Sequence, residues 1–151
     1  MPTRRKTLKH STIVAGLLAA TGLFPGLALA FNAKAFEAKT VADALKALGA
    51  ATPAESKDVT IIGPDIAENG AVVPLGASTT LAGVKQLLIL VEKNPSALVA
   101  AFNLTDSVDA NISTRAKMGQ SSDVYAVAVM NDGRTLFAKK EVKVTLGGCG
   151  G

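Results

Sequence analysis

The chain ends in Gly147-Gly148-Cys149-Gly150-Gly151, and Cys149 is the only cysteine among its 151 residues. A thiol can serve as a nucleophile, a metal ligand, a disulfide partner or a point of covalent attachment. Nothing in the local sequence would activate this thiol, because the nearest basic residue is Lys143 and no histidine is close by. The four glycines remove side-chain bulk and leave the backbone free to take many conformations. The pattern therefore predicts a flexible arm that carries an attachment point, rather than a self-activated nucleophile.

The remaining residues offer little chemistry of their own. The only histidine, His10, lies in a segment that we expect to be removed, which excludes a Cys–His or Ser–His pair and a Cys/His zinc site. Two acidic pairs, Asp65 with Glu68 and Asp106 with Asp109, could meet in a loop and bind a cation, although turn and capping roles are more usual for such residues. We therefore expect no catalytic residue, no cofactor and no metal site.

Residues 1–30 have the features of an export signal. The pair Arg4 and Arg5 precedes an apolar stretch from Ile13 to Leu29, which ends in the small-residue pattern before Phe31 that suits cleavage. The paired arginines and the apolar stretch broken by glycine and proline are similar to a twin-arginine signal. The alternative is a retained membrane anchor, but the glycine and proline interruptions argue against it. We expect a periplasmic protein without stable membrane insertion.

The net charge of +4 comes entirely from this N-terminal segment, which holds four basic residues and no acidic ones. The rest of the chain has equal numbers of basic and acidic residues. No basic stripe with interleaved aromatic residues is present, so nucleic acid is not an expected partner.

The pattern after residue 30 changes from helical to extended. Apolar residues recur at helical spacing through residues 31–50, and the pattern stops at Gly49. Short strands are then predicted at residues 59–62, 71–75, 86–91, 98–104, 112–118, 124–130 and 142–146, with a tight hairpin turn at Asp132-Gly133. Six or seven short strands without intervening helices indicate a mainly β protein, an immunoglobulin-like antiparallel β-sandwich with a short N-terminal helix. A small closed barrel is the alternative.

Two segments are candidate partner surfaces. Gln86–Val91 is apolar on both faces, as a strand buried on both sides would be. Arg115 and Lys117 alternate with Ala116 and Met118, which places two cations on one strand face. A solvated sheet face is the simpler interpretation of the two cations.

Several stretches together resemble the SoxY family of bacterial sulfur carriers. They are "PDIAENGAVVP" at 64–74, "TRAKMGQSSDVYAVAVMNDG" at 114–133 and "KEVKVTLGGCGG" at 140–151, and all five residues of the Gly-Gly-Cys-Gly-Gly terminus are kept. The resemblance implies a domain at 31–151, with a helix at 31–50 and a carrier arm at 147–151, in heterodimer with SoxZ. It implies that Cys149 is loaded with thiosulfate by the cytochrome SoxXA as an S-thiosulfonate. It also implies that the hydrolase SoxB then releases sulfate, and that a sulfane dehydrogenase, where present, oxidises the remaining persulfide. The chain would then be a substrate carrier and not an enzyme.

Two other functions remain open at this point. An exported β-sandwich binding protein could use Cys149 to link two copies by an intermolecular disulfide. Ubiquitin-like sulfur carriers also end in Gly-Gly, but they are activated by ATP, which an exported protein does not meet.

Overall fold

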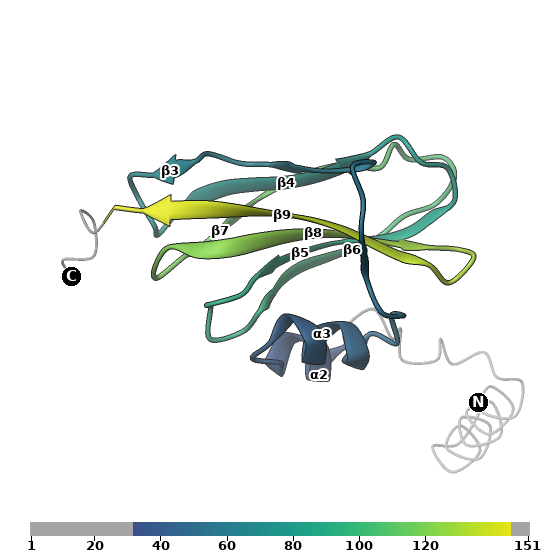
Figure 1. Ribbon diagram of the computed structural model, residues 1–151, viewed down its shortest axis with the longest axis horizontal. Coiled ribbons are helices and arrows are strands. Elements are labelled where there is room, and N and C mark those ends of the chain that lie inside the picture. The colour runs from purple at the N-terminus through teal and green to yellow at the C-terminus, as the bar shows by residue number, and fades with distance from the viewer. Residues whose placement is uncertain (1–31, 146–151) are drawn as a thin grey trace, which may run out of the picture. The chain divides into compact units, whose positions relative to one another are not determined.

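The computed structural model describes residues 32–145, which form two β-sheets and two short helices (Figure 1). The larger sheet has six strands in the order β1-β9-β8-β5-β6, with β3 also paired to β9, and the smaller sheet has the order β2-β4-β7. The helices are α2 (Ala33–Glu37) and α3 (Val41–Ala47). The strands are β1 (Ala54–Glu55), β2 (Val59–Ile62), β3 (Ile66–Ala67), β4 (Val73–Thr79), β5 (Val84–Val91), β6 (Leu98–Asn103), β7 (Asn111–Ala116), β8 (Ser122–Met130) and β9 (Thr135–Val144).

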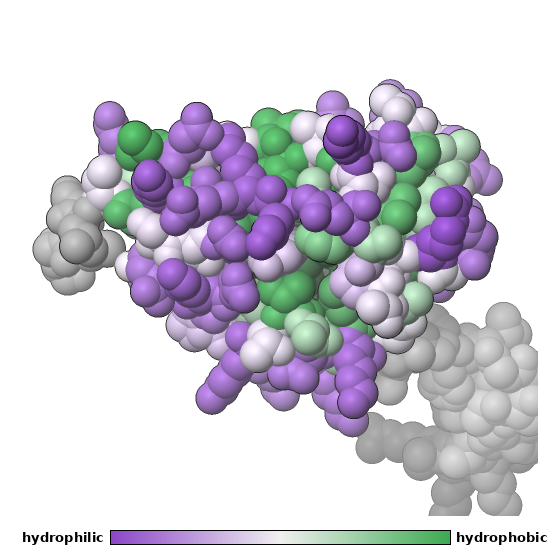
Figure 2. Space-filling view, viewed as in Figure 1, coloured by the Kyte–Doolittle hydropathy of each residue, from purple (hydrophilic) through white to green (hydrophobic). Residues whose placement is uncertain are grey.

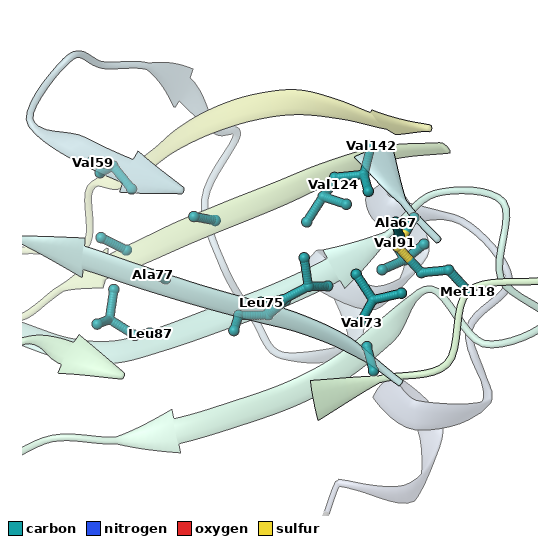
Figure 3. Packing of buried hydrophobic residues seen from close by; sticks show 14 of the residues in the cluster. Val59, Ala67, Val73, Leu75, Ala77, Leu87, Val91, Met118, Val124 and Val142 are labelled. Carbon is teal, nitrogen blue, oxygen red and sulfur yellow. The ribbon is translucent and has the colours of Figure 1, made fainter. Parts of the chain in front are cut away.

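The main core lies between the two sheets (Figure 3). Alternate residues of β4, Val73, Leu75 and Ala77, are buried against inward-facing residues of β5 and β8. This period of two is what a strand with one face on the core requires. The mainly β sandwich expected from the sequence is confirmed, and two separate sheets take the place of the alternative closed barrel.

A second apolar cluster covers the opposite face of the larger sheet. Leu88 and Leu90 of β5 pack there with Leu45 of α3 and Ala35 of α2. Strand β5 is therefore buried on both faces, which explains the unbroken apolar run from Leu87 to Val91. The same burial rules out Gln86–Val91 as a partner surface, because β5 lies inside the sheet between β8 and β6.

The helical segment differs from the prediction of one helix over residues 31–50. Thr40 is extended and its side chain accepts a hydrogen bond from the Asp43 backbone N–H, so a new helix begins there. The carbonyl groups at the end of α2 are used elsewhere. The Ser96 hydroxyl donates to the Phe36 carbonyl, and the Ala97 N–H donates to the Ala38 carbonyl at 2.9 Å. The helix is interrupted because these contacts with the chain before β6 replace its own hydrogen bonds.

The strands differ from the prediction in three respects. Strands β1 and β3 were not predicted, and both pair with β9 in parallel, so the larger sheet is not wholly antiparallel. Strand β4 starts at Val73 and continues through Gly76, where a β-carbon would lie 2.6 Å from the Ile112 carbonyl oxygen. Strand β9 starts at Thr135, directly after the predicted hairpin turn, and Gly133 takes the φ of 90° that this turn requires.

Candidate functional site

The sequence places the thiol of Cys149, the predicted attachment point, just beyond the end of β9. Cys149 and the glycines Gly147, Gly148, Gly150 and Gly151 lie outside the described residues, as do Arg4 and Arg5 of the expected export signal. Residues 141–145 are described, and they form the root from which the arm leaves the domain. The geometry of this root decides where Cys149 can go.

The arm root is held on one side by the loop that precedes β8. The Ser121 hydroxyl accepts a hydrogen bond from the Val144 backbone N–H at 2.9 Å. Next to it, Ser122 pairs with Val142 in the antiparallel ladder, and its buried hydroxyl accepts from the Lys93 N–H at 3.0 Å. Ser121 thus connects the end of β9 to the loop before β8, and Ser122 connects the start of β8 to the loop between β5 and β6.

The other side of the arm root is held by β3. Ile66 and Ala67 pair in parallel with Lys143 and Val144. The Ala67 carbonyl accepts from the Thr145 N–H at 3.1 Å, which extends the pairing to the last described residue. A backbone held on both edges cannot fray without breaking several hydrogen bonds, so the arm starts from a fixed point.

A lysine from the middle of β9 fixes the start of the β3 segment. The Lys140 Nζ lies 2.7 Å from Asp65 Oδ1 and donates to the Gly63 carbonyl at 2.8 Å. The hydrogen bond and the positive charge of Lys140 hold the pKa of the Asp65 carboxyl below its ordinary value. Asp65 is therefore paired with Lys140, and the possible cation site with Glu68 is replaced by a salt bridge.

Gly70 packs more closely than any side chain would permit. A β-carbon at this position would lie 2.4 Å from the Met118 carbonyl oxygen and 2.8 Å from Val144 Cγ1. The Gly70 carbonyl also accepts from the Met118 N–H at 2.7 Å. The loop between β3 and β4 therefore lies directly against the end of β9, and glycine is needed because the backbones approach so closely.

The other candidates lie away from the arm root. Asp106 and Asp109 line a polar cleft of about 780 Å³ at the opposite end of the sandwich, where β8 turns into β9. Arg115 and Lys117 are exposed while Ala116 and Met118 are buried, as the alternation predicted. Within residues 32–145 no group of three or more histidine, cysteine or acidic residues could hold a metal ion. No helix in that range is long and apolar enough to cross a membrane.

A family model described as "Sulfur oxidation protein SoxY" matches residues 44–149. The chain belongs to the SoxY family. The match includes Cys149, and it extends through both the loop with Gly70 and the loop with Ser121. A search of curated proteins returned no match.

Solved structures agree with the family and the fold. The sulfur carrier protein SoxY from Chlorobium limicola f thiosulfatophilum is 31% identical, with a TM-score of 0.61, over 68% of this chain and 92% of that one. A superoxide reductase (neelaredoxin) from Ignicoccus hospitalis matches with a TM-score of 0.52 at 16% identity, over 58% of this chain and 79% of that one. A putative superoxide reductase from Thermotoga maritima matches with a TM-score of 0.50 at 10% identity, over 58% and 85%. At these low identities the two reductases show a shared fold only.

The role of Cys149 as the attachment point stays a prediction, and sequence reasoning missed the residues that hold the arm root. No local pattern marks these residues, because their contacts join segments between 23 and 77 residues apart in the sequence. The residues are Ser121, Gly70 and Lys140. Their one signal was their presence in the stretches 64–74, 114–133 and 140–151, which together resemble the SoxY family.

Proposed function

We propose that this SoxY family member carries sulfur intermediates of thiosulfate oxidation as covalent adducts of Cys149, in the periplasm. The single cysteine, four residues beyond Thr145, whose backbone N–H is bound by the Ala67 carbonyl, is the observation on which the proposal rests. The relative from Chlorobium limicola, which is a sulfur carrier, supports the same function.

The loading step forms one sulfur–sulfur bond. The Cys149 thiol loses its proton and joins the outer sulfur of thiosulfate, giving the S-thiosulfonate Cys–S–S–SO₃⁻ and releasing two electrons. A cytochrome of the SoxXA type accepts these electrons. Thiosulfate is oxidised in this step, and Cys149 supplies the sulfur to which it is attached.

The unloading step breaks the bond between the sulfone sulfur and its neighbour. Water adds to the sulfone, sulfate leaves, and a persulfide Cys–S–SH remains on Cys149. A SoxB-type hydrolase performs this step, and a sulfane dehydrogenase oxidises the persulfide sulfur where the organism has one. The carrier supplies no acid, base or metal, and its contribution is to keep each intermediate attached and to present it.

The proposed carrier works with a SoxZ-like second β-sandwich subunit and is exported through a twin-arginine signal at residues 1–30. The twin-arginine pathway moves folded proteins, so a subunit without its own signal can cross as part of the complex. Replacing Arg4 and Arg5 with lysine would then keep both subunits out of the periplasm. Normal export of the second subunit in that variant would contradict joint export.

The decisive experiment is the intact mass of the mature protein after incubation with thiosulfate and the loading cytochrome. We expect a mass increase equal to one thiosulfate group on Cys149, and loss of cytochrome reduction in Cys149→Ser at an unchanged unfolding midpoint. Cytochrome reduction that survives in Cys149→Ser would refute the carrier function. A reductant-sensitive dimer without any sulfur adduct would instead support the binding protein linked by an intermolecular disulfide.

A further inference from the structure

Exposed large hydrophobic side chains are few among the described residues, and two of them lie at the arm root. Four such residues are found among residues 32–145: Ile62 (45% exposed), Ile66 (56%), Val72 (51%) and Val108 (57%). The first three belong to β2, to β3 and to the loop before β4, and the fourth lies in the loop between β6 and β7. Figure 2 shows hydrophobic surface among hydrophilic side chains over the β3 region.

Register and contacts place two of these residues, Ile66 and Val72, beside the end of β9. Ile66 is paired with Lys143 on one side of the arm root. Val72 is two residues after Gly70, which lies against Val144, so Val72 is within about 7 Å of that contact along the chain. Ile62 lies farther along the outer face of the smaller sheet, opposite Gly76, which is three residues after the start of β4. We call Ile66 and Val72 the collar.

Unpaired cations lie beside the collar. Val72 and Lys117 flank the last register pair of β4 and β7, Val73 with Ala116, and Arg115 is opposite Pro74 on the same outer face. Of the three ion pairs among the described residues, none includes Arg115, Lys117 or Lys143. Two exposed acids lie nearby, Glu68 in the same loop as Val72 and Glu141 two residues before Lys143 on β9. The surroundings of the collar are therefore basic on balance.

The length of the arm determines what must cover the collar. Cys149 is four residues beyond Thr145, which allows about 13 Å at full extension. An enzyme that encloses Cys149 in its active site has to bring the mouth of that site within this distance of the β9 end. The surface it then covers includes the collar, and burial of exposed apolar side chains favours such contact.

We propose that the collar is the docking surface for the enzymes that react at Cys149. Each such enzyme has an apolar rim around its active-site mouth, with acidic residues that face Arg115, Lys117 and Lys143. This inference rests on the proposed carrier function and adds the surface through which the carrier is recognised.

The test uses the double variant Ile66→Ser, Val72→Ser, with Val108→Ser as its matched control. All three side chains are more than half exposed, so folding loses little in either variant. Val108 lies in the loop after β6, at the end of the sandwich away from the arm root. Cys149 is loaded without any enzyme, by tetrathionate, whose exchange with the thiolate gives the S-thiosulfonate and releases thiosulfate. Loading must be equal in all variants, which separates thiol chemistry from docking.

The readout is sulfate release by the SoxB-type hydrolase, measured over a range of carrier concentrations. We expect kcat/KM to fall about tenfold in the double variant, equivalent to about 1.4 kcal/mol, through a higher KM at unchanged kcat. Val108→Ser should behave as the wild type. Equal kcat/KM in the double variant and the control overturns the docking surface but leaves the carrier function intact.

Two further outcomes are decisive in other ways. If the double variant no longer forms the complex with the second β-sandwich subunit in size-exclusion chromatography, the collar belongs to that subunit interface and the inference is wrong. If loaded wild-type protein releases no sulfate, the carrier function fails, and the docking surface fails with it.

Discussion

Replacing Gly70 with alanine tests whether the close packing at the arm root stabilises the domain. The added β-carbon would lie 2.4 Å from the Met118 carbonyl oxygen, which is a backbone atom and can move only with its loop. Such overpacking costs about 1–3 kcal/mol. The Met118-to-Gly70 hydrogen bond would stretch or break as well, at a cost of about 1 kcal/mol. We therefore expect a loss of about 3 kcal/mol in the free energy of unfolding.

Gly119 provides the matched control. It lies next to Met118, but a β-carbon there would have no atom within 4 Å, and its φ is not positive. Gly119→Ala should change the free energy of unfolding by less than about 1 kcal/mol, with a gain if the backbone fits alanine. Urea unfolding of the mature protein measures both variants, and thermal unfolding should show a drop of about 12 °C for Gly70→Ala. Equal midpoints for the two variants would refute the role of close packing at the arm root.

Two other predictions concern the contacts on either side of the arm root. Ser121→Ala removes the acceptor of the Val144 N–H. We expect the free energy of unfolding to fall by about 1 kcal/mol and hydrogen exchange at the Val144 amide to become faster. The control Ser113→Ala, on the exposed face of β7, should change neither quantity. Unchanged exchange at Val144 would show that water replaces Ser121 without cost. The second prediction concerns pH, because the folded-state pKa of Asp65 is depressed. The Asp65 carboxylate therefore stabilises the fold at a pH above its unfolded pKa of about 3.9. This stabilisation is lost as the pH falls through the lower folded-state pKa. In an NMR titration, Lys140→Met should therefore raise the titration midpoint of Asp65 toward its ordinary value, and an unmoved midpoint would contradict the assignment to Lys140.

The sequence predicted those features of the fold that have a local cause. The run from Leu87 to Val91 predicted a strand buried on both faces, and Asp132-Gly133 predicted the hairpin before β9; both are confirmed. The two-residue strands β1 and β3 could not be predicted, because such short segments have no periodicity and exist only through their pairing with β9. The break between α2 and α3 did have a local signal, Thr40 followed three residues later by Asp43, but the apolar spacing across it was read as one helix.

The candidate site divides in the same way. Residue type and neighbours alone single out Cys149, since one cysteine among four glycines is distinctive, and its role as the attachment point stays a prediction. The residues that fix the arm root could not be singled out in this way, because Ser121 and Gly70 act on Val144 through contacts that only the folded chain creates. The two-sided burial of β5 was recognised correctly, yet the inference of a partner surface from the same apolar residues was wrong, since its neighbours are elements of this chain.

If Cys149 carries sulfur as proposed, the hydrogen bonds that hold Val144 and Thr145 also set the local concentration of that sulfur. A tethered group can explore a volume that grows with the cube of its reach, so its effective concentration near the tether point falls accordingly. Unpairing of four more residues at the end of β9 would double the length of the tether between Cys149 and its fixed point. Because effective concentration falls roughly as the −3/2 power of tether length, that of the sulfur adduct at a docked enzyme would then fall about threefold. In the proposed carrier, the short parallel strand β3 would thus act on the rate of sulfur transfer, although it contributes no atom to the chemistry.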